Sequence, residues 1–276
     1  MKIKKLDGVL TENVLTEDKS VSFGGVEYPN FGWCVIVCGG SGSGKSSVVK
    51  NLVHINAKTL DVDEVQRVFL KHSEVDGDKI VTKSGKEYYL DDIPEPYDMS
   101  NPQYTGFVHK VTKPLARSKK NTFINSLQGV DKNRLPNVLF DITGKNSSDF
   151  SNIISTMKPL GYKIAVVWVL AELETALERN AKRSRVVPEK LVTDIYFSVL
   201  RTLTDIFNDK SFMSNIDEVY VVLNDMNFDT KDKGQLYDYT KIPNVYKIKS
   251  KDDVVKLPNR IASAINRAKR KAYETN

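Results

Sequence analysis

Eight consecutive residues early in the chain have the types and spacing of a phosphate-binding loop. Residues 39–46 read Gly-Gly-Ser-Gly-Ser-Gly-Lys-Ser and fit the pattern G-x-x-x-x-G-K-[ST]. Glycines let such a loop curl tightly, and its amides reach phosphate oxygens because no Cβ stands in the way. We therefore predict that the loop binds the phosphates of a nucleoside triphosphate, ATP or GTP. The residues expected to bind it are Gly40, Ser41, Gly42, Ser43, Gly44, Lys45, Ser46 and Ser47.

Three side chains are expected to act on the phosphates and on a magnesium ion. Lys45 would reach the β- and γ-phosphates, and the Ser46 hydroxyl would ligate Mg²⁺. Asp141 ends an apolar run at residues 137–140, where a carboxylate typically holds Mg²⁺ through a water. The structural alternative is that Asp141 caps the segment that follows.

Two carboxylates after another apolar run are candidates for the base that accepts a proton. Asp61 and Asp63 follow residues 57–60, and a carboxylate at the mouth of the site can accept the proton of an attacking hydroxyl. Asp63 is the preferred catalytic base. The alternative is structural, because residues 63–66 also read as a capping box in which Asp63 begins a helix.

Four basic residues lie close together after a predicted strand and helix. Their positions are Arg179, Lys182, Arg183 and Arg185. Arginines there could form a lid over the nucleotide, with Arg179 binding it and Arg183 and Arg185 neutralising charge during transfer. A solvated helix end is the alternative, because basic side chains at a helix C-terminus are favourable in any case.

Alternating apolar and amphipathic segments indicate how these residues are positioned. Strands are expected at 33–38, 57–60, 137–141, 162–170 and 218–223, and helices at about 47–53, 64–71, 147–158, 171–183, 188–207 and from 258. This rhythm predicts an α/β fold of the P-loop NTPase type, with a five-stranded parallel sheet covered by helices on both faces and ligands at the carboxyl ends of the strands. The helix at 188–207 should pack through a stripe formed by Leu191, Ile195, Val199, Leu203 and Ile206.

Residues 72–136 interrupt this rhythm and are expected to form a subdomain that handles the substrate. Residues 79–83 and 86–90 flank Ser84-Gly85, which predicts a hairpin with a two-residue loop. Asn101-Pro102 should begin a helix that is kinked or broken near Pro114. We thus expect an N-terminal extension over residues 1–32 and a kinase-type domain over 33–276 that contains this insertion.

Composition limits the class of protein. The chain has 276 residues, 40% hydrophobic and 28% charged residues, and a net charge of +6, which favours an anionic ligand. Its two cysteines, Cys34 and Cys38, share one strand face and suit a buried reduced pair. The start of the chain lacks a signal-peptide pattern and its longest apolar run is short, so a cytoplasmic location is expected and a membrane association is not.

The residues after Asp141 help to distinguish nucleotide hydrolysis from phosphoryl transfer to an acceptor. Motor-type and AAA-type ATPases place a Glu beside this Asp to activate water, whereas here Ile142-Thr143 follow. Residues 141–144 spell the D-x-x-G of GTPases, but no N-K-x-D element follows. Phosphoryl transfer to an acceptor hydroxyl is therefore favoured over hydrolysis.

Together, these motifs resemble the zeta-toxin-like and polynucleotide-kinase-like P-loop kinases. The resemblance rests on residues 39–47, 61–67, 138–143 and 179–188. It implies that Asp63 is the base, that Lys45, Arg183 and Arg185 stabilise the transfer, and that Ser46 and Asp141 position Mg²⁺. Gln66 stands where the group often has Arg, and the insertion has no counterpart in it.

Three functions follow as hypotheses. The first is an ATP-dependent kinase acting on a small or nucleotide-like acceptor. The second is a kinase of 5′-hydroxyl nucleic-acid ends, which draws on Lys110, Lys113, Arg117, Lys119, Lys120 and the basic C-terminal helix. The third is a nucleotide-binding assembly or regulatory protein that does not turn over a small acceptor.

Overall fold

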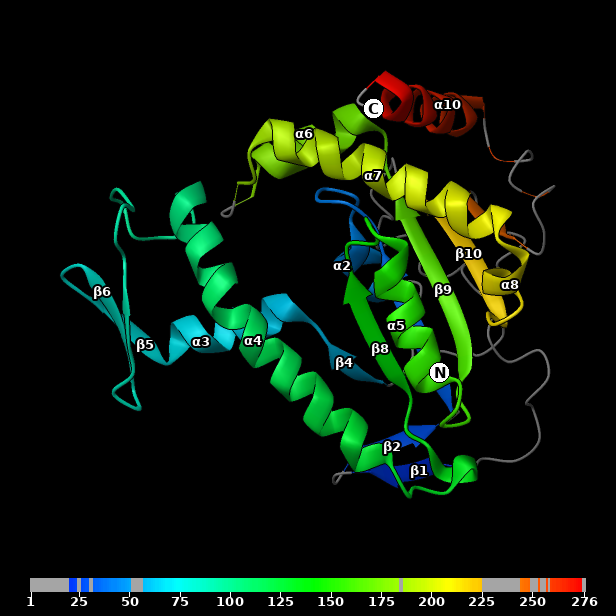
Figure 1. Ribbon diagram of the computed structural model, residues 1–276, viewed down its shortest axis with the longest axis horizontal. Coiled ribbons are helices and arrows are strands. Elements are labelled where there is room, and N and C mark those ends of the chain that lie inside the picture. Colours follow the sequence, from blue (N-terminus) through cyan, green and yellow to red (C-terminus); the bar gives the residue numbers. More distant parts are fainter. Residues whose placement is uncertain are drawn as a thin grey trace, which may run out of the picture.

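The computed structural model places most of the chain in one α/β unit with a projecting insertion (Figure 1). It describes residues 20–23, 26–29, 32–50, 57–183, 186–224, 244–248, 253, 257 and 259–274. Arg185, Asp225 and much of the expected N-terminal extension lie outside these residues. The division at residues 32 and 33 therefore stays a prediction.

A six-stranded sheet forms the centre, with the strand order β11-β10-β9-β3-β8-β4. The bounds are β3 Trp33–Cys38, β4 Lys58–Leu60, β8 Val138–Ile142, β9 Lys163–Leu170, β10 Glu218–Leu223 and β11 Val245–Lys247. The first five of these are parallel, as the sequence predicts. The sixth, β11, pairs antiparallel with β10 and was not expected, because three half-buried residues at a sheet edge carry little periodic signal.

The sheet has an apolar cluster on each face. Successive residues of a strand point to opposite faces, so Cys34, Ile36 and Cys38 join one cluster while Val35 and Val37 join the other. The first cluster is the larger and includes buried side chains from the helices that cover that face. The cysteines are buried and unbonded to each other, as predicted.

Helices follow the strands in the expected order. Their bounds are α2 Lys45–Val48, α3 Val62–Lys71, α5 Ser147–Met157, α6 Leu173–Ala181, α7 Glu189–Asn208, α8 Lys210–Met213 and α10 Asn259–Glu274. The larger cluster buries Phe150 of α5, Leu200 and Leu203 of α7 and Ile261 of α10. The predicted stripe on α7 is wrong at Leu191, which is 47% exposed, and Val192 is buried instead.

The insertion contains a three-stranded sheet and one long helix. The strands are β5 Ser73–Asp76, β6 Lys79–Thr82 and β7 Glu87–Tyr89, and the helix is α4 Pro102–Leu127. Strand β5 was not expected, because its mostly charged and exposed residues lack an apolar alternation. A short 3₁₀ helix, η2 Lys132–Arg134, leads back to β8.

The hairpin between β6 and β7 exists, but its loop differs from the prediction. The Thr82 amide donates to the Lys86 carbonyl, so three residues, 83–85, form the loop rather than two. Gly85 has a φ of +79°, the left-handed conformation that three-residue hairpins need at this position.

Helix α4 also differs from its prediction. Asn101 caps it as expected, its side-chain oxygen accepting from the Gln103 amide at 2.9 Å. The helix then runs unbroken through Pro114, although an interior proline costs about 3 kcal/mol. Packing at both ends accounts for this: Tyr104 and Val108 lie in a separate insertion core with Phe69 of α3, while Leu127 lies in the main core.

Candidate active site

The phosphate-binding loop connects β3 to α2 at the carboxyl edge of the sheet. Gly44 precedes α2 with a φ of +83° and Gly42 has a φ of +78°, a region that favours glycine. The Ser43 amide donates to the Gly40 carbonyl at 3.2 Å, and the Gly39 amide donates to Thr143 at the end of β8 at 3.1 Å. The chain therefore curls back on itself beside the end of the neighbouring strand.

Close packing around the loop explains its glycines. A Cβ on Gly42 would collide with the backbone of Ala176 in α6, and one on Gly44 would collide with the side chain of Asn224. A Cβ at Gly40 would meet only Ile195 Cγ2 at 3.6 Å, an ordinary van der Waals distance. The loop is thus pressed against α6 and the end of β10 at specific positions.

Asn224, directly after β10, forms hydrogen bonds that stabilise the loop. Its Nδ2 donates to the Ser43 carbonyl at 2.9 Å, and its own carbonyl accepts from Arg179 Nη1 at 2.6 Å. Asn224 is 2% exposed. The side-chain amide of Asn224 therefore holds the loop, while its backbone carbonyl fixes Arg179, the arginine expected to bind the nucleotide, beside the loop.

Lys45 joins the loop to the carboxylate on β8. Its Nζ donates to the Gly39 carbonyl at 2.8 Å and lies 3.8 Å from Asp141 Oδ1. Asp141 lies on the strand next to β3, paired opposite Val37. The loop lysine and the aspartate expected to hold Mg²⁺ therefore lie next to each other in the fold.

The predicted carboxylates come together around Asp141. Burial raises the pKa of Asp141 from 3.8 to about 6, the Lys45 ammonium opposes that shift, and Asp61 and Asp63 add to it. Burial also raises the pKa of Asp61. Carboxylates on the ends of β4 and β8 thus share one electrostatic environment with the loop lysine, which is the arrangement expected at a functional site.

The capping role proposed as an alternative for Asp63 belongs to Asp61 instead. Asp61 has extended dihedrals at the N-cap of α3, and its Oδ1 accepts from the Asp63 amide at 2.8 Å. The capping-box interpretation, with Asp63 as the first residue, is wrong by two positions. Asp63 lies in the first turn with an exposed side chain.

Helix α4 holds the helix that carries Asp63. Gln66 Nε2 lies 2.9 Å from His109 Nδ1, and Lys119 Nζ donates to Glu64 Oε2 at 3.0 Å. Gln66 is 2% exposed, and it lies one helical turn after Asp63, on the same face. The insertion therefore positions the helix that borders the candidate site.

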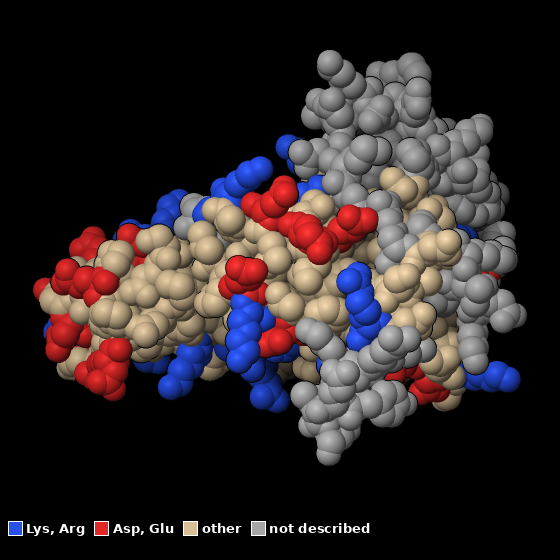
Figure 2. Space-filling model, turned by 90° about the horizontal axis from the view of Figure 1, so that it is seen from above, with Lys and Arg blue, Asp and Glu red and all other residues tan. Residues whose placement is uncertain are grey.

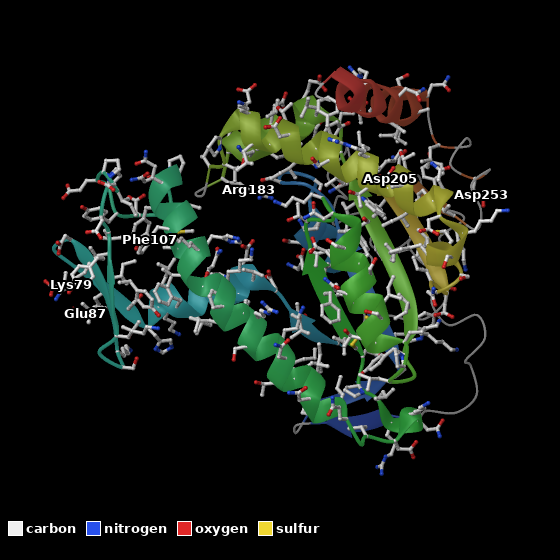
Figure 3. All side chains as sticks on the ribbon, viewed as in Figure 1. Lys79, Glu87, Phe107, Arg183, Asp205 and Asp253 are labelled. Atoms are coloured by element: carbon white, nitrogen blue, oxygen red, sulfur yellow. The ribbon has the colours of Figure 1, made fainter. Side chains whose placement is uncertain are left out.

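The basic segment after α6 begins beside the site. Asn180, at 3% exposure, donates through Nδ2 to the Val187 carbonyl at 2.7 Å and accepts from the Val187 amide at 3.2 Å. These two bonds join the last turn of α6 to Val187, on either side of Arg183. The Arg183 side chain is exposed at the end of α6 (Figure 3). The Ser41 hydroxyl lies 3.4 Å from Asn180 Oδ1, so the same asparagine also contacts the loop.

The donor set at this edge of the sheet suits a hard divalent cation. Ser46 supplies a hydroxyl in α2, and Asp141 supplies a partly buried carboxylate whose ionised form is stabilised by a nearby positive charge. Mg²⁺ prefers such oxygens combined with substrate phosphates and waters. Among the described residues no cluster of three or more His, Cys, Asp or Glu side chains forms a metal site.

Sequence reasoning missed Asn180 and the bracing role of Asn224. An asparagine at the end of a buried strand or in the last turn of a helix is compatible with many roles. Only the contacts with Ser43 and Val187, far away in the sequence, reveal these two roles.

The fold and this site define a P-loop α/β domain. The chain matches the family described as "AAA domain" over residues 34–196, more than half of its length, and it belongs to that family. AAA-type ATPases have a Glu directly after the Walker B aspartate, whereas this chain has Ile142 after Asp141. The family match confirms the predicted P-loop fold.

Solved structures share this fold at low identity. One from the PezAT chromosomal toxin–antitoxin system of Streptococcus pneumoniae is 12% identical, covers 99% of this chain and 96% of its own, and has a TM-score of 0.48. The native AvrRxo1-ORF1:-ORF2 complex is 12% identical, covers 87% and 75%, and has a TM-score of 0.48. The same complex with ATP is 13% identical, covers 69% and 54%, and has a TM-score of 0.44.

No curated protein matches the chain. Within the described residues no helix is both long and apolar enough to cross a membrane.

Proposed function

We propose that this protein is an ATP-dependent kinase that transfers the γ-phosphoryl group to a hydroxyl of a small or nucleotide-like acceptor. The observation that carries the proposal is the common environment of Lys45, Asp141 and the two aspartates after β4. A phosphate-binding loop beside several carboxylates supplies both a seat for the donor and a base for the acceptor.

Each residue has one task in this reaction. The loop amides and Lys45 hold the β- and γ-phosphates, and Ser46 and Asp141 hold Mg²⁺, which neutralises phosphate charge when bound. Asp63 accepts the proton of the acceptor hydroxyl while that oxygen bonds to the γ-phosphorus and the bond to ADP breaks. Arg183 and Arg185 offset the charge on the transferred group, and Arg179 binds the nucleotide.

Transfer is favoured over hydrolysis because Ile142 and Thr143, which carry no carboxylate, follow Asp141, and the Thr143 carbonyl accepts from the Gly39 amide. Asp63, in contrast, is exposed in the first turn of α3. Its carboxylate is therefore accessible to an acceptor hydroxyl.

Labelled-ATP transfer tests the proposal. The protein, with Mg²⁺ and [γ-³²P]ATP, is incubated with pooled metabolites and separately with 5′-hydroxyl oligonucleotides. Label should appear on an acceptor with the natural chain and be absent with Lys45→Ala. ATP binding without transfer to any acceptor would contradict the kinase proposal and favour a nucleotide-dependent assembly or regulatory protein.

A further inference from the structure

Helix α4 carries an unusual distribution of charge. Over Pro102–Leu127 it has no Asp or Glu, but it has five Lys and Arg residues: Lys110, Lys113, Arg117, Lys119 and Lys120. Residues three or four apart on a helix share a face. Four of the five, at positions 110, 113, 117 and 120, therefore form one row, which we call the α4 cationic row.

The fifth cation has a different environment. Lys119 points to α3, where it pairs with Glu64 at 3.0 Å. Within the described residues no carboxylate pairs with any member of the α4 cationic row. The row is thus four uncompensated positive charges on a helix that packs through its other sides.

The length of the row suits a chain of phosphates. At about 1.5 Å of rise per residue, positions 110 to 120 span about 15 Å. A stacked nucleic-acid strand has one phosphate per about 3.4 Å, so the row matches about four phosphates.

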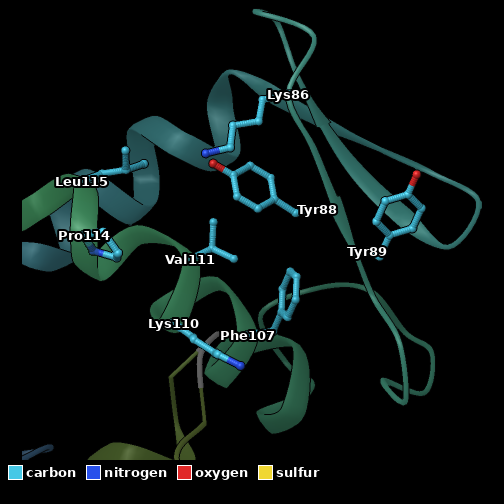
Figure 4. Close-up of a pocket in the computed structure, with 8 residues that line it drawn as sticks. All are labelled: Lys86, Tyr88, Tyr89, Phe107, Lys110, Val111, Pro114 and Leu115. Atoms are coloured by element: carbon cyan, nitrogen blue, oxygen red, sulfur yellow. The ribbon is translucent and has the colours of Figure 1, made fainter.

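A pocket of about 360 Å³ begins where the row begins (Figure 4). Lys110 belongs to both, and Pro114, three residues before Arg117, lines the same pocket. Two rings form much of the wall, Phe107 on α4 and Tyr88 on the small sheet, while the ring of Tyr89 lies on the other face of β7 (Figure 4). The pocket is therefore continuous with the cationic row.

The pocket offers flat apolar surfaces together with positive charge. Lys86 Nζ lies 4.9 Å from the centre of the Tyr88 ring, and the Phe107 ring lies across the pocket from Tyr88. The nearby carboxylate of Glu87 is neutralised by Lys79 at 2.7 Å and accepts from the Tyr89 hydroxyl. Other acidic side chains gather at the tip of the insertion, and basic side chains lie between that tip and the centre of the molecule (Figure 2). An unstacked base would fit between Phe107 and Tyr88, and its phosphates would lie beside Lys110 and the rest of the α4 cationic row.

We infer that the insertion binds single-stranded nucleic acid, with a base in the aromatic pocket and the backbone along the α4 cationic row. Exposed rings beside a cationic track are the general means of holding single strands, because every base has a face that stacks. A duplex keeps its bases stacked inside and would leave the rings unused. This site is separate from the phosphate-binding loop and does not rest on the proposed kinase activity.

The first test measures how salt affects the affinity. A labelled single-stranded oligonucleotide of about 12 nucleotides is titrated with the full chain at several salt concentrations. For single strands log K changes with log salt by about −0.7 per neutralised phosphate, so four contacts predict a slope of about −2.8. Lys113→Ala/Arg117→Ala should reduce it to about −1.4, whereas Lys119→Ala, on the same helix but another face, should leave it unchanged.

The second test addresses the pocket. Phe107→Ala should weaken binding about fivefold or more through lost stacking, while Tyr89→Ala, which removes a ring on the other face of β7, should leave binding within about twofold. Lys45→Ala should bind the oligonucleotide as the natural chain does, because the site does not include the loop. Circular dichroism shows whether each variant is folded.

Several results would overturn the inference. Among the ligands, these are no binding to the strand, equal or tighter binding to the duplex of the same sequence or to polyglutamate, and a mononucleotide that binds as tightly as the strand. Among the variants, they are equal changes of the salt slope in Lys119→Ala and in the double variant, and loss of oligonucleotide binding in Lys45→Ala.

Discussion

At the scale of single residues, three aspartates near the loop have different environments. Asp61 has a hydrogen bond that starts a helix, Asp141 is partly buried beside Lys45, and Asp63 has an exposed carboxylate in the first turn of α3. We therefore propose a structural task for Asp61, a charge-holding task for Asp141 and a proton-accepting task for Asp63.

Replacing these aspartates should separate catalysis from folding. Asp63→Asn should reduce phosphoryl transfer by about 10²-fold or more, because an amide cannot accept the proton, and leave stability nearly unchanged. Asp61→Ala should lower the free energy of unfolding by about 1 kcal/mol through loss of the N-cap. Transfer assays and urea denaturation of both variants measure this.

The opposite pattern would contradict the assignment. If Asp63→Asn retained full transfer while Asp61→Ala abolished it at saturating substrate, the base would be Asp61.

Asp141 predicts a dependence of stability on pH. Its carboxyl has a pKa of about 6 in the folded chain instead of 3.8, so between about pH 4 and 6 the folded state binds more protons than the unfolded state. The free energy of unfolding should therefore fall as pH rises through this window, by up to about 3 kcal/mol. Asp141→Asn should lack this contribution and be the more stable protein at pH 7.

Urea denaturation of both proteins from pH 4 to 7, without Mg²⁺ or nucleotide, measures the difference. Identical pH profiles would mean that Asp141 is not desolvated.

At the scale of elements, the site depends on close packing between the loop, α6 and β10. Gly42 lies against α6, and Asn224 at the end of β10 holds the Ser43 carbonyl. Nucleotide binding should therefore respond to changes that move α6 against the loop.

Two glycines in the loop form a matched pair. Gly42→Ala should weaken ATP binding by at least about tenfold, because its Cβ would meet the backbone of Ala176 and its φ is positive. Gly40→Ala should bind ATP within about threefold, since its surroundings leave room. Calorimetric titration with ATP measures the affinity of each variant. Equal losses of affinity at both positions would show that packing against α6 is unimportant for ATP binding.

Asn180 should control the segment that carries Arg183. Asn180→Ala removes both bonds to Val187 and should make opening of this segment more frequent. Tryptic cleavage after Lys182 and Arg183 should become faster, and Glu178→Ala, an exposed change on the same helix, serves as the control. Unchanged cleavage would show that other contacts hold the segment.

The sequence predicts elements well where local pattern and packing agree. The strand and helix that flank the loop could be predicted from the motif, because a buried strand, glycines and an amphipathic run occur in succession. The strands β5 and β11 could not be predicted, since they are short, polar and paired at edges. The capping residue of α3 was misplaced because Asp61 and Asp63 both suit an N-cap, and only the backbone at Asp61 distinguishes them.

At the scale of the whole molecule, the sheet and the insertion meet along α3 and α4. Helix α4 extends from the insertion core, with Tyr104 and Val108, to the main core at Leu127. The helix that carries Asp63 lies between these cores and contacts α4 through Gln66 and Glu64. The insertion therefore helps to position the helix that carries Asp63, which the sequence alone did not show.

Binding of ATP to the complete chain is the most direct test of the account. Calorimetry with Mg²⁺ should detect binding of ATP or GTP well below millimolar concentration, and Lys45→Ala should weaken it by at least about tenfold through loss of its contacts with phosphate. If the natural chain showed no heat of binding with either nucleotide at millimolar concentration, the loop at residues 39–46 would not be a phosphate site and the proposed kinase would be contradicted.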